Sequence, residues 1–259
     1  MSVGGSERRL APTWTEMVTE QDALAALDLA RPGLDLGEWQ RQAHEYLDQP
    51  QQRRRQKVIR LVRERLLDHD GGQILDSAFL RLLRGGSPHL RAGLVHGRIC
   101  FAQPLVASAL DALVHPALAR REAPLALQDA GLIRHEAWEQ WLRGCLPADT
   151  GASAFDKTRS NVQKALANVG VLDLQANTRR RIRAQRGRPH PLAFCWLLGH
   201  ELVTGGRTEA PEAWALGQSF AARLFAPLPA YAATCLEAGI GAGLLRRGYL
   251  AGSARLHPG

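Results

Sequence analysis

The side chains best suited to chemistry in this sequence are hydrogen-bond donors rather than nucleophiles, and they gather between Asp156 and Pro189. Five of them fall on one side, or on the flanks, of a predicted helix: Lys157, Ser160, Asn161, Gln163 and Lys164. Such side chains bind phosphate oxygens, and amides and lysines also bind base edges in the major groove. The pattern predicts a nucleic-acid contact on a helix face that is expected to carry no carboxylate.

A cluster of arginines follows this helix, with no acidic residue between Asp173 and Glu201: Arg179, Arg180, Arg181, Arg183, Arg186 and Arg188. Positive charge at this density repels itself and favours a polyanion nearby. We expect the first four of these arginines to hold phosphates. The alternative for a basic run is a solvated surface loop, and the neighbouring helix without acids favours the phosphate interpretation.

No convergent set of catalytic groups is evident in the sequence. It contains no phosphate-binding G-x-x-x-x-G-K-[ST] loop, no G-x-G-x-x-G after a strand and no H-E-x-x-H metal motif. The glycines from Gly239 to Gly243 lack a lysine and a preceding strand, so they indicate a helix end rather than a nucleotide site. We therefore expect a protein that is not an enzyme, with no catalytic residue, no metal and no cofactor.

The composition indicates a basic globular protein. Over 259 residues the net charge is +8 and the sequence pI is about 10.0, so an acidic partner such as nucleic acid is the first expectation. Only three of the 33 basic residues are lysines, which is typical of a GC-rich genome and weakens any argument from the number of arginines alone. Their positions in the chain are more informative.

Cysteine usage and hydropathy predict a cytoplasmic protein that does not enter a membrane. Cys100, Cys145, Cys195 and Cys235 stand far apart, without a C-x-x-C pair, as expected of reduced core thiols. The first residues lack the apolar stretch of a secretory signal. The longest apolar tract, residues 99–118, is interrupted by prolines and polar residues.

The polar residues must be positioned by a helix, and we predict one from Asp156, as N-cap, to Val169, ended by a left-handed Gly170. Val162, Ala165, Leu166 and Val169 form its apolar face. Residues 171–174, a turn at 176–178 and a returning strand at 181–183 then predict a hairpin, with Ile182 between arginines. Helices within residues 127–146 are expected to precede this unit and complete a winged helix.

The N-terminal part carries a second basic segment on a predicted helix. Helices are expected at residues 22–30, 36–47 and 51–67, followed by one at 73–84. The third begins with Arg53, Arg54 and Arg55, whose position at the positive end of a helix predicts a further phosphate contact. This part is compatible with a helix-turn-helix, and a generic helical bundle with an exposed basic face remains the alternative.

The predicted fold class is mainly α. We expect a flexible tail at residues 1–15, a helical, helix-turn-helix-like domain at 16–125, a winged-helix domain with a small β-hairpin at 126–190, and a helical C-terminal region at 191–259. The segment from Gly243 to Leu256 predicts a hairpin at the end of that region.

The order of these features resembles the BrxA family of the BREX (bacteriophage exclusion) defence systems of bacteria. The supporting blocks are YLDQPQQRRRQKVIRLVRERL, from Tyr46 to Leu66, and DKTRSNVQKALANVGVL, from Asp156 to Leu172. The resemblance implies a small, non-enzymatic DNA-binding component, mainly helical, with helix-turn-helix and winged-helix parts. It also implies other BREX defence proteins as partners.

The leading hypothesis is therefore a cytoplasmic antiviral-defence protein that binds double-stranded DNA without catalysis and with little sequence preference, through arginine–phosphate contacts. The alternative is a protein-interaction scaffold of the same complex whose basic faces dock acidic partners. RNA binding is less favoured, because no aromatic residues are interleaved with the arginines. Assembly into a homo-oligomer stays open.

Overall fold

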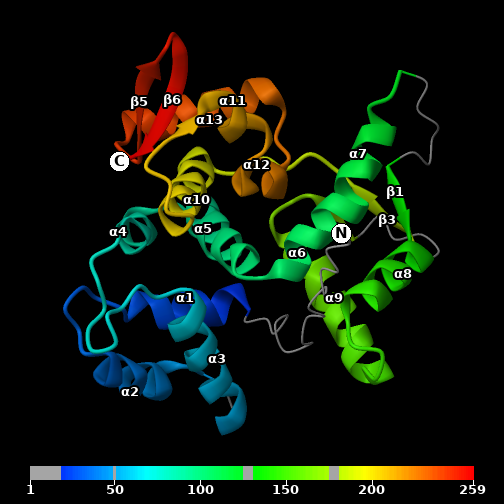
Figure 1. Ribbon diagram of the computed structural model, residues 1–259. Helices are drawn as coiled ribbons and strands as arrows, with labels where there is room; N and C mark the ends of the chain where they lie inside the picture. Colours follow the sequence, from blue (N-terminus) through cyan, green and yellow to red (C-terminus); the bar gives the residue numbers. More distant parts are fainter. Residues whose placement is uncertain (1–18, 49–50, 125–130, 175–180) are drawn as a thin grey trace, which may run out of the picture. The chain divides into compact units, whose positions relative to one another are not determined.

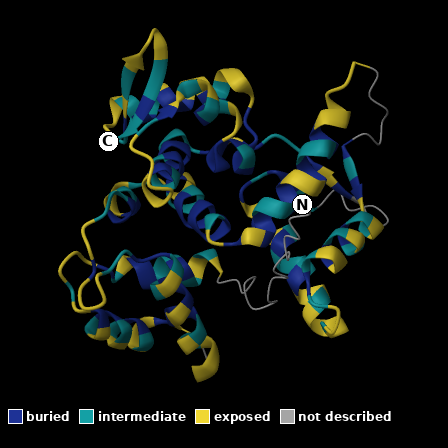
Figure 2. Cartoon of the chain, in the orientation of Figure 1, coloured by how far each residue is buried: buried dark blue, intermediate teal, exposed yellow. Residues whose placement is uncertain are grey.

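The computed structural model describes residues 19–48, 51–124, 131–174 and 181–259 (Figure 1). They form two compact units. In the described residues, unit 1 comprises residues 103–124, 131–174 and 181–185, and unit 2 comprises residues 19–48, 51–102 and 186–259. The chain is mainly helical, and each unit carries a three-stranded antiparallel sheet (Figure 1). Figure 2 shows buried residues along the inward helix faces of both units. The predicted tail at residues 1–15 lies outside the described residues.

This division differs from the predicted domains in two places. Residues 103–124, expected in the N-terminal domain, cluster with the central segment. Residues 186–259 cluster with the N-terminal helices, although 186–190 were expected in the winged-helix domain. The second difference arises because α10 (Pro191–Thr204) packs on α5 (Pro88–Phe101) within unit 2. Gly93 permits this approach, since a Cβ there would lie 2.9 Å from the Cβ of Ala193. Hydrophobic periodicity cannot reveal such a long-range helix pair.

Unit 2 begins with three helices, α1 (Glu20–Asp28), α2 (Leu36–Tyr46) and α3 (Gln52–Arg65), close to the predicted ranges. Side-chain caps set two of the starts: Thr19 accepts from the Asp22 backbone NH at 3.2 Å, and Asp35 from that of Glu38 at 2.9 Å. Trp39 is fully buried, and its indole NH donates to the Ala26 carbonyl at 3.0 Å. That bond satisfies the one polar atom of this core side chain.

The predicted helix at residues 73–84 is shorter in the structure, where α4 spans Ala78–Gly85. Ser77 caps it by accepting from the Leu80 backbone NH at 3.4 Å. Before the cap, Gln73 and Ile74 form isolated β-bridges with Asp35 and His69. The backbone groups of these residues therefore bond to other segments instead of to a helix.

The remainder of unit 2 consists of α11 (Glu212–Gly217), α12 (Phe220–Phe225), α13 (Pro229–Gly241) and a sheet. The sheet has the order β4-β6-β5, formed by β4 (Ala210–Pro211), β5 (Leu245–Leu250) and β6 (Ser253–Pro258). The predicted terminal hairpin is confirmed, with Gly252 at φ 80° in its turn. The predicted helix end at Gly239–Gly243 is also confirmed, because α13 ends at Gly241. Within this segment, a side chain at Gly239 would collide with Cys195.

Unit 1 starts with one interrupted helix, made of α6 (Pro104–Ala109), a π-helical segment η2 (Leu110–Val114) and α7 (His115–Arg121). Pro116 lacks a backbone NH and cannot continue the regular hydrogen-bond ladder, which accounts for the widened turn before it. The chain continues as β1 (Leu132–Arg134), α8 (His135–Cys145), α9 (Ala152–Asn168), β2 (Leu172–Asp173) and β3 (Arg181–Ala184).

The prediction of helices alone across residues 127–146 was wrong in its first part, because residues 132–134 form a strand. Strand β3 lies between β1 and β2, antiparallel to both, and Ile133 is the cross-strand partner of Ile182. Both isoleucines are buried. A three-residue strand acquires its partner only from the distant β3, so it has no local periodic signal. The predicted returning strand, with Ile182 inward between arginine positions, is confirmed.

Candidate nucleic-acid interface

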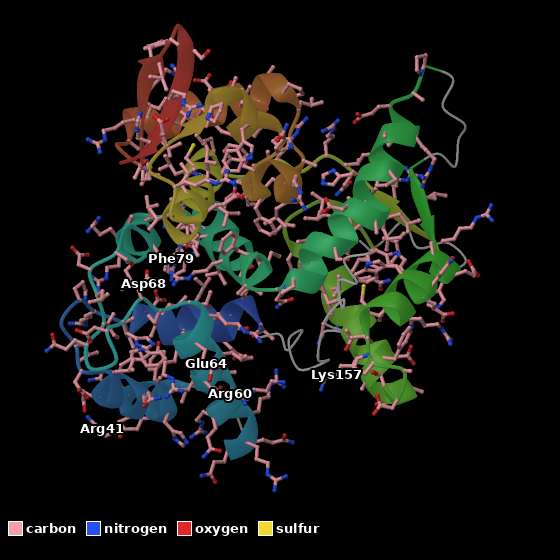
Figure 3. All side chains as sticks on the ribbon, viewed as in Figure 1. Arg41, Arg60, Glu64, Asp68, Phe79 and Lys157 are labelled. Carbon is pink, nitrogen blue, oxygen red and sulfur yellow. The ribbon has the colours of Figure 1, made fainter. Side chains whose placement is uncertain are left out.

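The polar face of α9 is built by helix geometry. Val162, Ala165, Leu166 and Val169 are buried, as predicted. Lys157, Ser160 and Lys164, spaced three and four residues apart, therefore share the opposite side of the helix. The two lysines are exposed, and within the described part of the chain neither has an ion-pair partner. Figure 3 labels Lys157 on α9.

The amides expected to read bases lie on the flanks of this face. Asn161 and Gln163 are half-buried, as is Ser160. Asn161 also takes part in an interaction within the protein. Of the five residues predicted on α9, the two lysines are thus the most accessible. The amide side chains of Asn161 and Gln163 would have to extend from the flank of the helix to contact a base.

The start of α9 was predicted wrongly. The helix begins at Ala152, with Gly151 as N-cap, and Asp156 lies inside it. Asp156 is therefore not a cap, and the prediction of a face without a carboxylate fails at this position. Residues 152–155 contain two alanines, which favour helix, and extend it by one turn. Asp156 instead forms an ion pair with Arg159, with 2.9 Å between Oδ1 and Nη2.

Arg159 joins α9 to α8. Its Nη1 lies 2.9 Å from His135 Nε2 and 3.2 Å from Glu139 Oε1, both on α8. The Arg159 side chain is 16% exposed, so it is held between the helices and is not available to a ligand as Lys157 and Lys164 are. The network partly neutralises Asp156 and Glu139 and fixes α9 against α8.

The sheet of unit 1 presents a second basic surface. Ile182 is buried, whereas Arg183 is exposed, as is Arg134 on β1. Leu132 is the cross-strand partner of Arg183, and Arg134 follows it by two residues, so both arginines lie on one side of the sheet. Like charges at these neighbouring positions repel. Asp173 on β2 is the other cross-strand partner of Arg183, so this surface is mostly, not entirely, basic.

The other arginines of the predicted wing are only partly described. Arg179 and Arg180 lie outside the described residues. Arg181 opens β3, where its Cα is paired with that of Arg134. Among the described arginines of the cluster, Arg183 and Arg188 are exposed, whereas Arg186 is half-buried and donates to the Ala226 and Pro227 carbonyls at 3.3 Å.

The sequence did not predict Arg134 as a site residue, because the strand on which it lies was not predicted. The signal that could have found it is the alternation in Leu132, Ile133 and Arg134, which matches the pattern of a half-buried strand. Three residues are too few for that alternation to be distinguished from a helix end.

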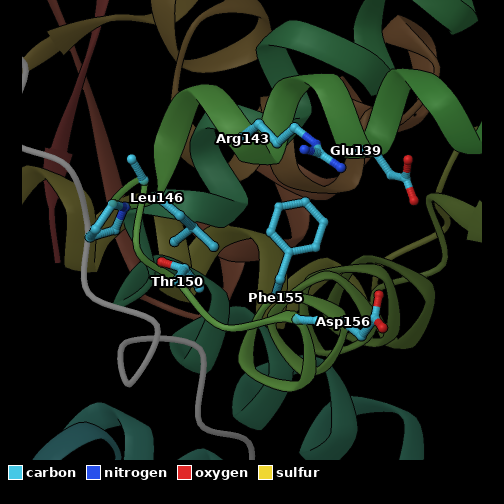
Figure 4. Close-up of a pocket in the computed structure, with 9 residues that line it drawn as sticks. Glu139, Arg143, Leu146, Thr150, Phe155 and Asp156 are labelled. Carbon is cyan, nitrogen blue, oxygen red and sulfur yellow. The ribbon is translucent and has the colours of Figure 1, made fainter.

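A hollow of about 560 Å³ opens between the end of α8 and the start of α9 (Figure 4). The Arg143 guanidinium lies over the Phe155 ring, 5.7 Å from its centre. Glu139 and Asp156 also line the hollow (Figure 4). Because the hollow is lined by both basic and acidic side chains, it does not favour anions over cations. We assign it no role in anion binding.

The third predicted group, Arg53, Arg54 and Arg55, belongs to unit 2 and differs from residue to residue. Arg53 is exposed and has no ion-pair partner in the described chain. Arg54 lies 3.9 Å from Asp22 Oδ2. Arg55 donates to the His44 carbonyl at 3.0 Å. Two of the three arginines therefore already have a partner within unit 2, although the Arg54 side chain is 56% exposed and its pair is weak.

The remaining reactive groups are buried or dispersed. Among the described residues, no group of three or more His, Cys, Asp or Glu side chains is arranged to hold a metal ion. The four cysteines are free thiols, and burial raises the pKa of Cys100 and Cys195 to about 12 and that of Cys235 to about 11. These three thiols stay protonated near neutral pH and are poor nucleophiles.

The comparisons with known proteins return no match to a family model, to a curated protein or to a solved structure. No single described helix is long and apolar enough to cross a membrane.

Proposed function

We propose that unit 1 binds double-stranded DNA without catalysis, with α9 in the major groove and the β2–β3 hairpin beside it. The observation that carries this proposal is the polar stripe of Lys157, Ser160 and Lys164, with both lysines exposed, on a helix whose opposite face is buried. A helix placed in the major groove presents such a stripe to phosphates and base edges.

The order of elements supports a winged-helix arrangement. A helical segment precedes β1, then α8 and α9 follow, and the hairpin β2–β3 closes a sheet in which β3 is central. In this arrangement α9 is the recognition helix and the hairpin is the wing. The Arg159 network with His135 and Glu139 holds α9 in place, so the lysines are presented on a rigid element.

The charges on the proposed surface favour binding with little sequence preference. Lysines and arginines that meet phosphates release counterions, so the affinity falls steeply with salt. Sequence preference would come from Asn161, Gln163 or Lys164. The proposal does not extend to Arg53–Arg55, because Arg54 and Arg55 bind within unit 2. On the resemblance to the BrxA family, we further propose that the protein acts in a BREX-type anti-phage defence system.

The test is fluorescence anisotropy of the full-length protein with a labelled random duplex and with single-stranded RNA over a salt series. We expect tight duplex binding whose logarithmic salt slope is about −0.9 per phosphate contact, and weaker RNA binding. Alanine at Arg179, Arg180 and Arg181 together should weaken binding to all duplexes and flatten the slope. Absence of duplex binding at low salt would overturn the proposal, and an unchanged slope in the triple variant would remove the wing from it.

A further inference from the structure

Helix α3 of unit 2 is strongly basic on its own. Its 14 residues carry seven basic side chains and one acid, Glu64. Val58, Leu61 and Val62 are buried, so Arg53 and Arg60 point away from the core of unit 2, and both are exposed. Figure 3 labels Arg60 and Glu64 on this helix. The helix offers a narrow positive ridge about 21 Å long, at 1.5 Å per residue.

A groove of about 320 Å³ runs beside this ridge, between α2 and α3. Its lining residues share two properties: none is a carboxylate, and all but one carry a polar group. They are Gln40, His44, Gln56, Ile59, Arg60 and Arg63. The surface of the walls is mostly aliphatic, and it comes from side chains that also carry polar groups. The groove therefore suits a ligand that is both anionic and partly apolar.

Acidic residues near the groove disfavour binding of a wide polyanion more than binding of a single extended chain. Residues 19–48, which form α1 and α2, carry seven carboxylates and two arginines. Glu38 and Glu45 lie on the outer side of α2 and bracket Arg41, at 2.6 Å and 2.8 Å from its guanidinium nitrogens. A broad polyanion that covered α2 as well as α3 would meet these acids. A single extended chain along α3 need not cover that side of α2.

We infer that the groove between α2 and α3 binds an acidic segment of a protein partner, with one apolar side chain in the groove and carboxylates on Arg60 and Arg63. An extended segment of about seven residues spans the ridge, at about 3.3 Å per residue. Both arginines already have contacts within the protein: Arg60 takes part in one interaction, and Arg63 lies 3.7 Å from Glu64 in an exposed pair that solvent screens. The partner carboxylates share or displace these contacts. This site is separate from the DNA surface proposed on α9 and the hairpin, and it gives the two units different partners.

The probe is a labelled peptide of about ten residues, made of glutamates with two leucines, and its twin with serine in place of both leucines, which has the same charge. Binding to the full-length protein is measured by anisotropy. We expect the leucine peptide to bind more tightly than the serine peptide. The variant Arg60→Gln with Arg63→Gln should bind the leucine peptide about tenfold more weakly.

The matched control removes the same charge elsewhere in unit 2, with Arg31→Gln and Arg246→Gln, two exposed arginines outside the groove. It should change peptide affinity by less than about twofold. None of the four substituted side chains is buried, and unchanged thermal melting checks that the variants fold.

Three results would overturn the inference. Equal binding of the two peptides means that charge alone is recognised. Equal weakening in the groove variant and the control means that the attraction is not local. If the groove variant loses duplex affinity as strongly as peptide affinity, the α3 surface belongs to the DNA site instead.

Discussion

The two sheets of this protein have the same topology and differ in how most of their arginines are partnered. In both, the last strand in sequence is central: β3 lies between β1 and β2, and β6 between β4 and β5. In the sheet of unit 2, Arg247 bonds to Glu212 and Glu237, at 2.8 Å and 2.7 Å, and Arg255 bonds to Glu209 at 2.6 Å. The exception in the sheet of unit 2 is Arg246, which is exposed and donates to the Pro258 carbonyl. In the sheet of unit 1, Arg134 and Arg183 have no ion-pair partner among the described residues.

The difference teaches that an arginine on a strand is a candidate for ligand binding when no acid of its own unit forms an ion pair with it. Arg183 meets this condition although Asp173 is its cross-strand partner on β2. Unit 2 places three carboxylates around its sheet arginines: Glu209 just before β4, Glu212 on α11 and Glu237 on α13. They raise the pKa of Arg247, and Arg255 lowers that of Glu209. Unit 1 leaves positive charge exposed on β1, β3 and α9. The first arrangement stabilises a fold, and the second attracts an anion.

The largest effect is expected on the stability of unit 2, when its buried ion pair between Arg98 and Asp68 is broken. Arg98 is 7% exposed and bonds to Asp68 through two nitrogens, at 3.0 Å and 2.5 Å, with Phe79 below its guanidinium at 4.8 Å. Arg98→Met leaves the Asp68 charge without its partner, and should lower the free energy of unfolding by about 3–5 kcal/mol in urea denaturation. The double variant Arg98→Met, Asp68→Leu should recover part of this loss. If it recovers none, the pair is not what stabilises this region.

The next effect concerns the exposed charges of unit 1. Alanine at Lys157, Lys164 and Arg183 together should weaken duplex binding about 100-fold near 0.1 M salt and reduce the salt slope by roughly 0.9 for each phosphate that is no longer neutralised. The free energy of unfolding should change by less than about 0.5 kcal/mol for each substitution.

The control for these three substitutions is a variant with alanine at Arg31, Arg207 and Arg246, which loses the same charge from exposed positions of unit 2. Anisotropy should detect little change in its duplex affinity. Equal weakening in the two variants would show that duplex affinity depends only on the net charge of the protein. It would contradict the assignment of DNA binding to unit 1.

A smaller effect is expected for Arg247→Gln. The Arg247 side chain is 24% exposed and Glu237 is 63% exposed, so solvent screens part of the interaction. We expect a loss of about 1 kcal/mol in the free energy of unfolding and no change in duplex binding. Glu212→Gln should cost more than Glu237→Gln, because Glu212 is the more buried partner. Weaker duplex binding by the folded Arg247 variant would contradict the assignment of this sheet to structure.

The smallest effect is a pH dependence in unit 2. Burial and the nearby Arg98 lower the pKa of His200, which stacks on Trp196. Below the unfolded pKa of about 6.5, the unfolded chain binds a proton that the folded chain does not, so stability should fall as the pH drops from 7 and then level off below the folded pKa. His200→Gln should reduce this slope in denaturation curves at several pH values. A slope of the same size in the variant would assign it to other groups.

The sequence predicted correctly those features of the structure that depend only on neighbouring residues. The apolar face of α9 and the left-handed turn after it, with Gly170 at φ 81°, match the prediction because helix periodicity and a positive φ depend on neighbouring residues. The inward position of Ile182 and the hairpin around Gly252 were predicted for the same reason. These elements carry most of the candidate site on α9 and β3.

The start of α9 was misplaced because two local signals competed. Asp156 is a good N-cap, yet the alanines before it also favour helix, and Gly151 can adopt the extended cap conformation. The consequence reaches the site, since Asp156 became an acid on the polar face and drew Arg159 into a network with α8. Its partners His135 and Glu139 are about twenty residues away in the sequence.

By itself, the sequence determined that this protein is basic and mainly helical, that an amphipathic helix with two lysines is followed by a hairpin, and that one further helix is densely basic. These properties follow from residue type and short-range spacing. Only the tertiary structure decided that α10 joins the N-terminal helices, that Arg134 shares a sheet with Arg183, and which arginines already have an acid beside them. Charge pairing and strand pairing depend on contacts between distant segments, and a one-dimensional pattern does not contain those distances.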